Sequence, residues 1–309
     1  MTVQLTREQV RKDLRVYMNR TGMDLHQIAD ETGFTHRTLI QFVSEAQYGT
    51  GDGSLTAAAL KSFMDVHPWE PPDLPGHLYE TAATREMDEL LAYCRKGRWG
   101  TLYGPAGSQK SFWGEYRAAE AARGAEPGLL WIPIAGRTTA AAMLRKISMA
   151  VGAPYAQASD AIRQNIIYTV KKRRTPVALL LDEMDLLEKD IDTLETLRRL
   201  GDLLRGKLGL IVAGNEQIIY LFKERQGRYF EQWRSRIEQR ELRVLGPTRE
   251  EARGMAMAEL GEATEAQVNG LLDDCTVKAP LSGKKYISAR RLFFAIENIR
   301  DLREKRRAN

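Results

Sequence analysis

The sequence predicts an α/β protein in which helices cover both faces of a parallel sheet, with smaller helical units before and after it. Four short apolar runs read as strands: 99–103, 129–134, 177–181 and 208–213. Helical patterns alternate with them, at about 110–123, 138–151, 158–173 and 191–205. This alternation is typical of parallel strands joined by helical crossovers, and runs that are apolar throughout suit strands buried on both faces.

Composition places the chain among soluble globular proteins, with 309 residues, 43% hydrophobic content and room for two or three domains. It contains no run of eighteen apolar residues, and its polar first residues lack a secretory signal. We therefore expect a cytoplasmic protein with no membrane partner, in which Cys94 and Cys275 are reduced thiols. The net charge of +5 is compatible with a polyanionic partner and equally with an ordinary basic surface.

Proline content and the end of the strand signals predict the domain boundaries. The segment from His67 to Gly76 contains four prolines, which suit neither a helix interior nor a central strand. The strand signals stop near Pro247, and three helical patterns follow, at 248–261, 264–275 and 286–305. The predicted domains are an all-α N-terminal domain (1–66), a proline-rich linker (67–79), an α/β core (80–245) and a helical lid (246–309).

The N-terminal domain contains the pattern of a helix-turn-helix in residues 25–44. The small, turn and apolar residues fall at the spacings this unit needs: Ala29, Gly33, Leu39 and Phe42. Thr35 is predicted to cap the second helix. Arg37 and Gln41 would then face outward, where a recognition helix contacts DNA. A helical packing module that touches no DNA is the alternative.

A glycine-rich turn between the first strand and the first helix of the core reads GPAGSQKS. Loops of this kind aim backbone N–H groups at phosphates. Lys110 would reach the β- and γ-phosphates of ATP, and Ser111 would hold Mg²⁺. The other residues predicted to surround the phosphates are Gly104, Pro105, Ala106, Gly107, Ser108 and Gln109. Gln109 stands where the usual pattern has glycine, which puts the loop geometry and the ATP affinity in question.

The third apolar run ends in Asp182 and Glu183, at the edge of the sheet where α/β proteins bind ligands. Asp182 would be part of the ATP-binding site and would orient Mg²⁺ through water. Glu183 would be the base that orients and polarises the attacking water. Asn215 follows the fourth run and is predicted to position the same water, whereas Asp185 is interpreted as an ordinary surface acid.

Two arginine clusters follow the predicted strands. An arginine from the segment WRSRIEQR can complete the nucleotide site of a neighbouring subunit by neutralising charge in the transition state. Arg236 is the first choice, with Arg234 and Arg240 as alternatives, and a plain surface face is the competing interpretation. In the predicted lid, Arg290 opens a helix and would point back toward the phosphates, with Arg291 as the competing choice.

The P-loop and the motifs LLLDE, AGN, SRI and ARRL, in this order and with a helical lid, resemble those of AAA+ ATPases. The N-terminal domain resembles phage-repressor (Cro/C1) domains, and nearly the whole chain resembles the phage Mu transposition protein B (MuB) family, related to the IstB and TnsC transposition ATPases. The resemblance implies these roles: Walker A for Lys110 and Ser111, Walker B for Asp182 and Glu183, sensor 1 for Asn215, arginine finger for Arg236 and sensor 2 for Arg290.

The resemblance also implies a function. It implies an ATPase that hydrolyses ATP to ADP and phosphate, binds double-stranded DNA with little sequence preference, and activates a transposase at the target DNA. The protein would assemble with itself as a helical filament on the DNA, with a closed ring as the alternative. A helicase-loader ATPase with the same motifs is the alternative. A DNA-binding regulator with weak or no ATP turnover is a third possibility, which Gln109 favours.

A DNA path is predicted along one helix of the core. Arg137 and Thr139 follow a strand and open this helix, a geometry that suits phosphate contacts. Arg145 and Lys146 lie further along it. A solvated charged face is an equal alternative for these residues, and it is favoured for the basic run at 171–174.

Overall fold

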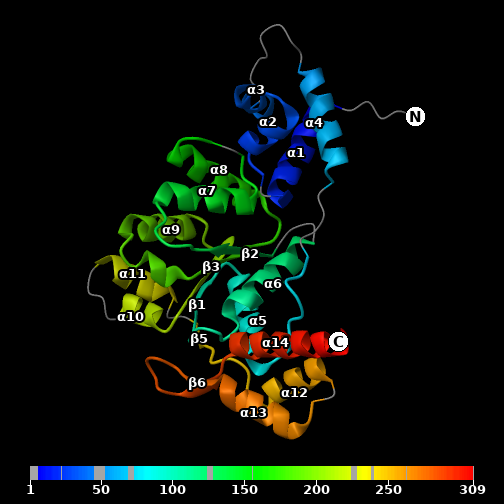
Figure 1. Cartoon of the computed structure of the whole chain (residues 1–309). Helices are drawn as coiled ribbons and strands as arrows, with labels where there is room; N and C mark the ends of the chain where they lie inside the picture. The colour runs from blue at the N-terminus through cyan, green and yellow to red at the C-terminus, as the bar shows by residue number, and fades with distance from the viewer. Residues whose placement is uncertain are drawn as a thin grey trace.

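The computed structural model describes residues 6–21, 23–44, 53–68, 73–123, 128–154, 156–223, 228–237, 240–261 and 263–308. In these residues a five-stranded parallel sheet has the strand order β2-β3-β4-β1-β5 (Figure 1). The strands are β1 (Trp99–Tyr103), β2 (Leu129–Pro133), β3 (Val177–Asp182), β4 (Leu208–Gly214) and β5 (Glu241–Arg243). The predicted parallel α/β fold is confirmed. The sequence did not predict β5, because this short edge strand carries two charged residues and no apolar run.

Strand β3 shows how the sheet divides the core. All six of its residues are buried. Val177, Leu179 and Leu181 pack into the apolar cluster on one face, whereas Ala178 and Leu180 pack into the cluster on the other face. Because successive side chains of a strand point to opposite faces, a run without polar residues is what a doubly covered strand requires.

Helices cover both faces of the sheet (Figure 1). The helices of the core are α5 (Ala82–Cys94), α6 (Lys110–Ala122), α7 (Ala140–Val151), α8 (Ser159–Lys172), α9 (Ile191–Leu203), α10 (Gln217–Lys223) and α11 (Arg228–Ile237), and a short 3₁₀ helix, η1 (Met184–Leu187), follows β3. Both cysteines are buried free thiols. Among the described helices, none is long and apolar enough to cross a bilayer.

The N-terminal residues form a four-helix unit with its own apolar cluster. Its helices are α1 (Arg7–Thr21), α2 (Leu25–Thr32), α3 (His36–Val43) and α4 (Ser54–Val66). Gly33 ends α2 with φ 72°, a conformation that favours glycine, and Thr35 caps α3 by accepting a hydrogen bond from the Thr38 amide. Helix α1 contacts α7 of the core. Helices α2 and α3 and the turn between them lie in the predicted segment. The assignment of this unit as a helix-turn-helix domain and its DNA-binding role stay predictions.

The C-terminal lid differs from the prediction of a purely helical unit. Its helices are α12 (Arg249–Leu260), α13 (Glu265–Cys275) and α14 (Ala289–Ala308). Between α13 and α14 an antiparallel hairpin joins β6 (Thr276–Lys278) to β7 (Lys285–Ile287). The predicted helix at 286–305 therefore begins only at Ala289, because the residues before it pair with β6. No helix or strand lies between residues 73 and 81, and residues 69–72 of the predicted linker are outside the described residues.

Candidate nucleotide-binding site

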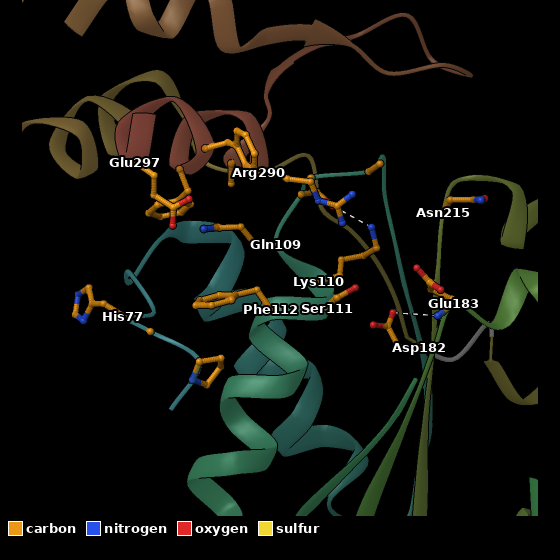
Figure 2. Close-up of a pocket in the computed structure, with 18 of the residues that line it drawn as sticks. His77, Gln109, Lys110, Ser111, Phe112, Asp182, Glu183, Asn215, Arg290 and Glu297 are labelled. Atoms are coloured by element: carbon orange, nitrogen blue, oxygen red, sulfur yellow. Dashed lines mark hydrogen bonds between the residues drawn. The ribbon is translucent and has the colours of Figure 1, made fainter. Parts of the chain in front are cut away.

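A cavity of about 790 Å³ lies at the ends of β3 and β4, beneath α14 (Figure 2). Its walls come from the loop between β1 and α6, the ends of β3 and β4, the η1 turn, the segment that precedes α5, and helices α12 and α14 of the lid. The carboxyl ends of parallel strands are the usual place for ligands in α/β folds. The cavity thus joins segments that are far apart in the sequence.

The loop between β1 and α6 is in direct contact with the lid. A Cβ on Gly107, whose φ is 83°, would lie 2.3 Å from the hydroxyl of Ser288, so only glycine fits there. The Ala289 amide donates a hydrogen bond of 2.9 Å to the Gly107 carbonyl. The Tyr286 hydroxyl donates one of 2.8 Å to the Ala106 carbonyl. The position of the lid is therefore coupled directly to the shape of this loop.

Gln109 has the left-handed backbone that glycine would ordinarily supply, with φ 71° and ψ 1°. This conformation costs a non-glycine residue roughly 1–2 kcal/mol. Helix α6 nevertheless begins at the next residue. Glutamine in place of glycine therefore keeps the tight backbone turn of the loop, and the Gln109 backbone is strained as a result.

Lys110 is held inside the loop. Its ammonium donates to the Gly104 carbonyl at 2.8 Å, to the Pro105 carbonyl at 3.1 Å and to the Ser108 hydroxyl at 3.0 Å. Burial lowers the pKa of Lys110 to about 8, with nearby Asp182 opposing the shift. A buried amine among oxygen acceptors at a helix start is a suitable partner for phosphate oxygens.

Asp182 and Glu183 differ sharply in their surroundings. Asp182 is buried, and its carboxylate accepts hydrogen bonds from the Glu183 amide at 3.0 Å and from the indole of Trp131 at 3.3 Å. Glu183 is exposed to the cavity, and its φ of 58° turns the chain abruptly at the end of β3. The pair therefore offers one fixed carboxylate and one accessible carboxylate at the same strand end.

The residues present suit a magnesium ion. Ser111 and Asp182 both line the cavity and offer a hydroxyl and a carboxylate oxygen, which are ligands that Mg²⁺ prefers. No cluster of three or more histidine, cysteine, aspartate or glutamate side chains suited to a metal occurs in the described part of the chain. Such a sparse set is typical of Mg²⁺ that takes its other ligands from water and substrate phosphates.

Asn215 is oriented by Asp185. Its amide group donates to Asp185 at 2.7 Å, and its backbone N–H donates to the same carboxylate at 3.2 Å. Asp185 lines the cavity, so its interpretation as an ordinary surface acid was wrong. The position of Asp185 could have been predicted from its spacing to Asp182, because the η1 turn brings the third residue after Asp182 back toward the end of β3.

The predicted arginines lie in different places. Arg290 lines the cavity at the start of α14 and comes from the lid toward Lys110, whereas Arg291 is not among the lining residues (Figure 2). Arg236 forms a two-pronged ion pair with Asp202, at 2.7 and 2.9 Å, and does not line the cavity. Arg234 and Arg240 do not line the cavity either. Arg234 donates to the Phe222 carbonyl, and Arg240 pairs with Glu89.

The aromatic half of the cavity was not predicted from the sequence. His77 and Phe112 line it from the core side, and Phe293, Phe294 and Glu297 line it from α14. Aromatic faces and apolar edges of this kind suit a flat heterocycle. Phe112 directly follows the Lys-Ser pair and was the available signal, whereas only the fold brings α14 to the same place.

The predicted DNA-contacting residues lie away from this cavity, since none of them is among its lining residues. Arg137, Thr139, Arg145 and Lys146 are exposed, and the Thr139 hydroxyl caps α7 by accepting from the Ala142 amide at 3.2 Å. On α3, Arg37 is exposed and Gln41 is half-buried. Their contact with DNA stays a prediction.

The parallel sheet and the glycine-rich loop resemble those of a P-loop AAA+ domain. Residues 94–222, which include the loop and strands β1 to β4, match the family described as an AAA domain. No curated protein sequence matches the chain, so the resemblance to the MuB family stays a prediction.

Two solved structures share the fold. One is Cdc6p from Pyrobaculum aerophilum, with a TM-score of 0.51 and 16% identity over 72% of this chain and 62% of that one. The other is Orc1 from Aeropyrum pernix in complex with DNA, with a TM-score of 0.51 and 19% identity over 79% of this chain and 64% of that one. The chain thus spans less than two thirds of the length of either protein, and the likeness concerns the fold.

Proposed function

We propose that the protein binds and hydrolyses ATP with Mg²⁺ and uses this cycle to control its association with DNA and with further copies of itself. The observation that carries the proposal is the convergence in one cavity of Lys110, Ser111, Asp182 and Glu183, from two separate strand ends. A phosphate loop next to a pair of carboxylates is the arrangement that phosphoryl transfer to water requires.

Each residue has a role that its surroundings support. Lys110 binds the β- and γ-phosphates, while Ser111 and Asp182 hold Mg²⁺, which when bound neutralises phosphate charge. Glu183, the accessible carboxylate, accepts a proton from the attacking water, and Asn215, held by Asp185, orients that water. Arg290 approaches the phosphates from the lid. The aromatic half of the cavity binds the base.

An arginine from a neighbouring subunit completes the site in this proposal. Arg236 is the first choice and requires its pair with Asp202 to open, whereas Arg240 pairs with an exposed glutamate. Mixing Arg236→Ala subunits with Glu183→Gln subunits tests this role, because an arginine that acts across an interface restores activity in mixed assemblies. No recovery at any mixing ratio would exclude Arg236.

The DNA-linked task has two candidates. The fold shared with Cdc6p and with Orc1, which was solved in complex with DNA, supports a replication-initiator or helicase-loader role. The motif order and the N-terminal helical unit support the transposition role, in which the partner is a transposase and the protein forms a filament on target DNA. The shared fold favours the loader role. Co-purification with a replicative helicase or with a transposase distinguishes the two.

Hydrolysis is tested by phosphate release from ATP with and without duplex DNA. We expect turnover in wild type and a loss of at least about 100-fold in Glu183→Gln, with ATP binding retained. Wild-type protein that binds ATP and DNA but releases little or no phosphate would instead support the remaining possibility, a DNA-binding regulator with weak or no ATP turnover. Electron micrographs with duplex DNA and an ATP analogue test self-assembly.

A further inference from the structure

Gln109 has features that phosphate binding does not explain. Its backbone has a φ of 71°, which is unfavourable for a side chain. The residue is 8% exposed, and its carboxamide oxygen is buried without a hydrogen-bond partner. A strained backbone and an unpaired buried acceptor both oppose folding, and such costs are characteristic of ligand-binding positions.

The side chain of Gln109 lies between the two halves of the cavity. Figure 2 shows it pointing away from Lys110, toward the half lined by His77 and Phe112. The residues that suit phosphates are on one side of it, and those that suit a base are on the other. In a nucleotide the sugar links these two parts, so the sugar is the part that would pass Gln109.

The chemistry of the carboxamide also points to the sugar. Phosphate oxygens accept hydrogen bonds and offer no proton to a carbonyl oxygen, whereas sugar hydroxyls both donate and accept. We infer that Gln109 is a specificity-determining residue whose carboxamide binds a sugar hydroxyl, so that the site favours nucleotides that carry this hydroxyl over those that lack it. The inference rests on the proposed function, because it requires a nucleotide in this cavity.

The test compares dissociation constants of ADP, 2′-deoxyADP and 3′-deoxyADP by calorimetry, since diphosphates are not turned over. Gln109→Met keeps the length of the side chain and removes the carboxamide, whereas Gln109→Gly also removes the backbone strain. We expect wild type to bind ADP about 3- to 10-fold more tightly than one of the deoxynucleotides, as a single neutral hydrogen bond provides. Each variant should bind ADP and that deoxynucleotide with the same affinity.

Several outcomes would overturn the inference. Equal affinities of wild type for the three nucleotides would do so, as would discrimination that survives in Gln109→Met. A further titration uses purine riboside diphosphate, which differs from ADP in lacking the exocyclic amine of the base. If Gln109→Met abolishes a preference against this ligand instead, the carboxamide contacts the base, and the sugar assignment is wrong.

The controls separate folding from binding and this inference from the proposed function. Thermal unfolding without nucleotide shows whether each variant folds, and Gln109→Gly carries the test if Gln109→Met does not. Wild type that binds none of the nucleotides overturns the proposed function. Wild type that binds them without discrimination overturns the role of Gln109 alone.

Discussion

Single residues of the cavity are held in conformations and environments that are unfavourable by themselves. Lys110 carries a buried ammonium, and burial lowers its pKa to about 8. Among the described residues other than glycine, Gln109 and Glu183 are those with positive φ, and both line the cavity. Because strain and desolvation lower stability, their concentration in one place indicates a site selected for binding and chemistry.

Lys110→Ala is expected to weaken ATP binding by at least about 100-fold, since charge-assisted bonds to phosphate contribute about 1.5–3 kcal/mol each. Nucleotide-dependent assembly should be lost with it. The free energy of unfolding without nucleotide should change little, because the buried ammonium is itself costly. Calorimetry with an ATP analogue measures the first effect and urea unfolding the second. Affinity within threefold of wild type would contradict the assignment of the loop.

Among the helices, α9 and α11 are joined by a chain of ion pairs that includes Arg236. Arg198 pairs with Glu195 at 2.7 Å and with Asp202 at 2.6 Å, and Asp202 also binds Arg236. These side chains are partly to largely buried, so screening by solvent is weaker than for surface pairs. The chain fixes α11 against α9 and thereby sets where Arg236 lies.

The pH dependence of this network follows from Glu195. Hydrogen bonds from Arg198, together with Arg199, lower the pKa of Glu195 from 4.5 to about 2. A lowered pKa stabilises the folded state above pH 4.5, and the contribution is lost as the pH falls from 4.5 toward 2. Glu195→Gln should therefore lower the free energy of unfolding at pH 7 by about 1–2 kcal/mol.

Urea unfolding of wild type and Glu195→Gln at several pH values measures this contribution. The difference between the two proteins should shrink below pH 4.5. Glu120→Gln is a matched control, because Glu120 forms an exposed pair on α6 and its loss should change stability by less than about 0.5 kcal/mol. A difference that stays constant down to pH 3 would mean that Glu195 acts by packing and not by charge.

In the whole molecule, the lid is bonded to both sides of the cavity. Tyr286 and Ala289 bond to the phosphate loop. At the tip of the hairpin, the Leu281 amide donates to Glu216 at 3.3 Å, and Arg243 pairs with the same buried carboxylate. Glu216 directly follows Asn215, so the lid contacts the loops that hold both the lysine and the proposed water-orienting amide.

Tyr286→Phe removes one of these bonds and nothing else. We expect nucleotide affinity to fall about 2- to 10-fold, because the loop loses a hydrogen bond that holds it under the lid. Tyr168→Phe is the matched control, since Tyr168 is 58% exposed on α8 and does not line the cavity. Calorimetry compares the two. Unchanged affinity in Tyr286→Phe would show that the hairpin does not influence the loop.

Contact with DNA is a property of the whole surface. Arg137→Ala and Lys146→Ala should each weaken duplex DNA binding and lower the salt dependence by about one unit of slope, as the loss of one phosphate contact does. Nucleotide affinity should not change, because neither residue lines the cavity. Lys171→Ala, in the last turn of α8, is the control for a solvated charge. Anisotropy titrations at several salt concentrations measure both quantities, and identical slopes in all variants would contradict the predicted DNA path.

The α/β class, the four longer strands of the sheet, the glycine-rich loop and the Asp182–Glu183 pair at a strand end could all be predicted from the sequence alone. These follow from local properties: apolar runs form buried strands, and glycine with lysine and serine sets a loop at a helix start. Gln109 has the positive φ that glycine would have at this position of the loop. These elements form as the local sequence predicts because tertiary packing stabilises the same local structure.

Which distant residues share the cavity could not be predicted from the sequence, because it depends on how the chain packs. It placed His77, Phe293 and Arg290 around one space, turned Asp185 toward Asn215 and tied Arg236 to Asp202. It also formed β5 and the hairpin of the lid, whose three-residue strands carry too little pattern to be predicted. Such contacts join residues far apart in the chain, and their free energy comes from partners that no local stretch of sequence contains.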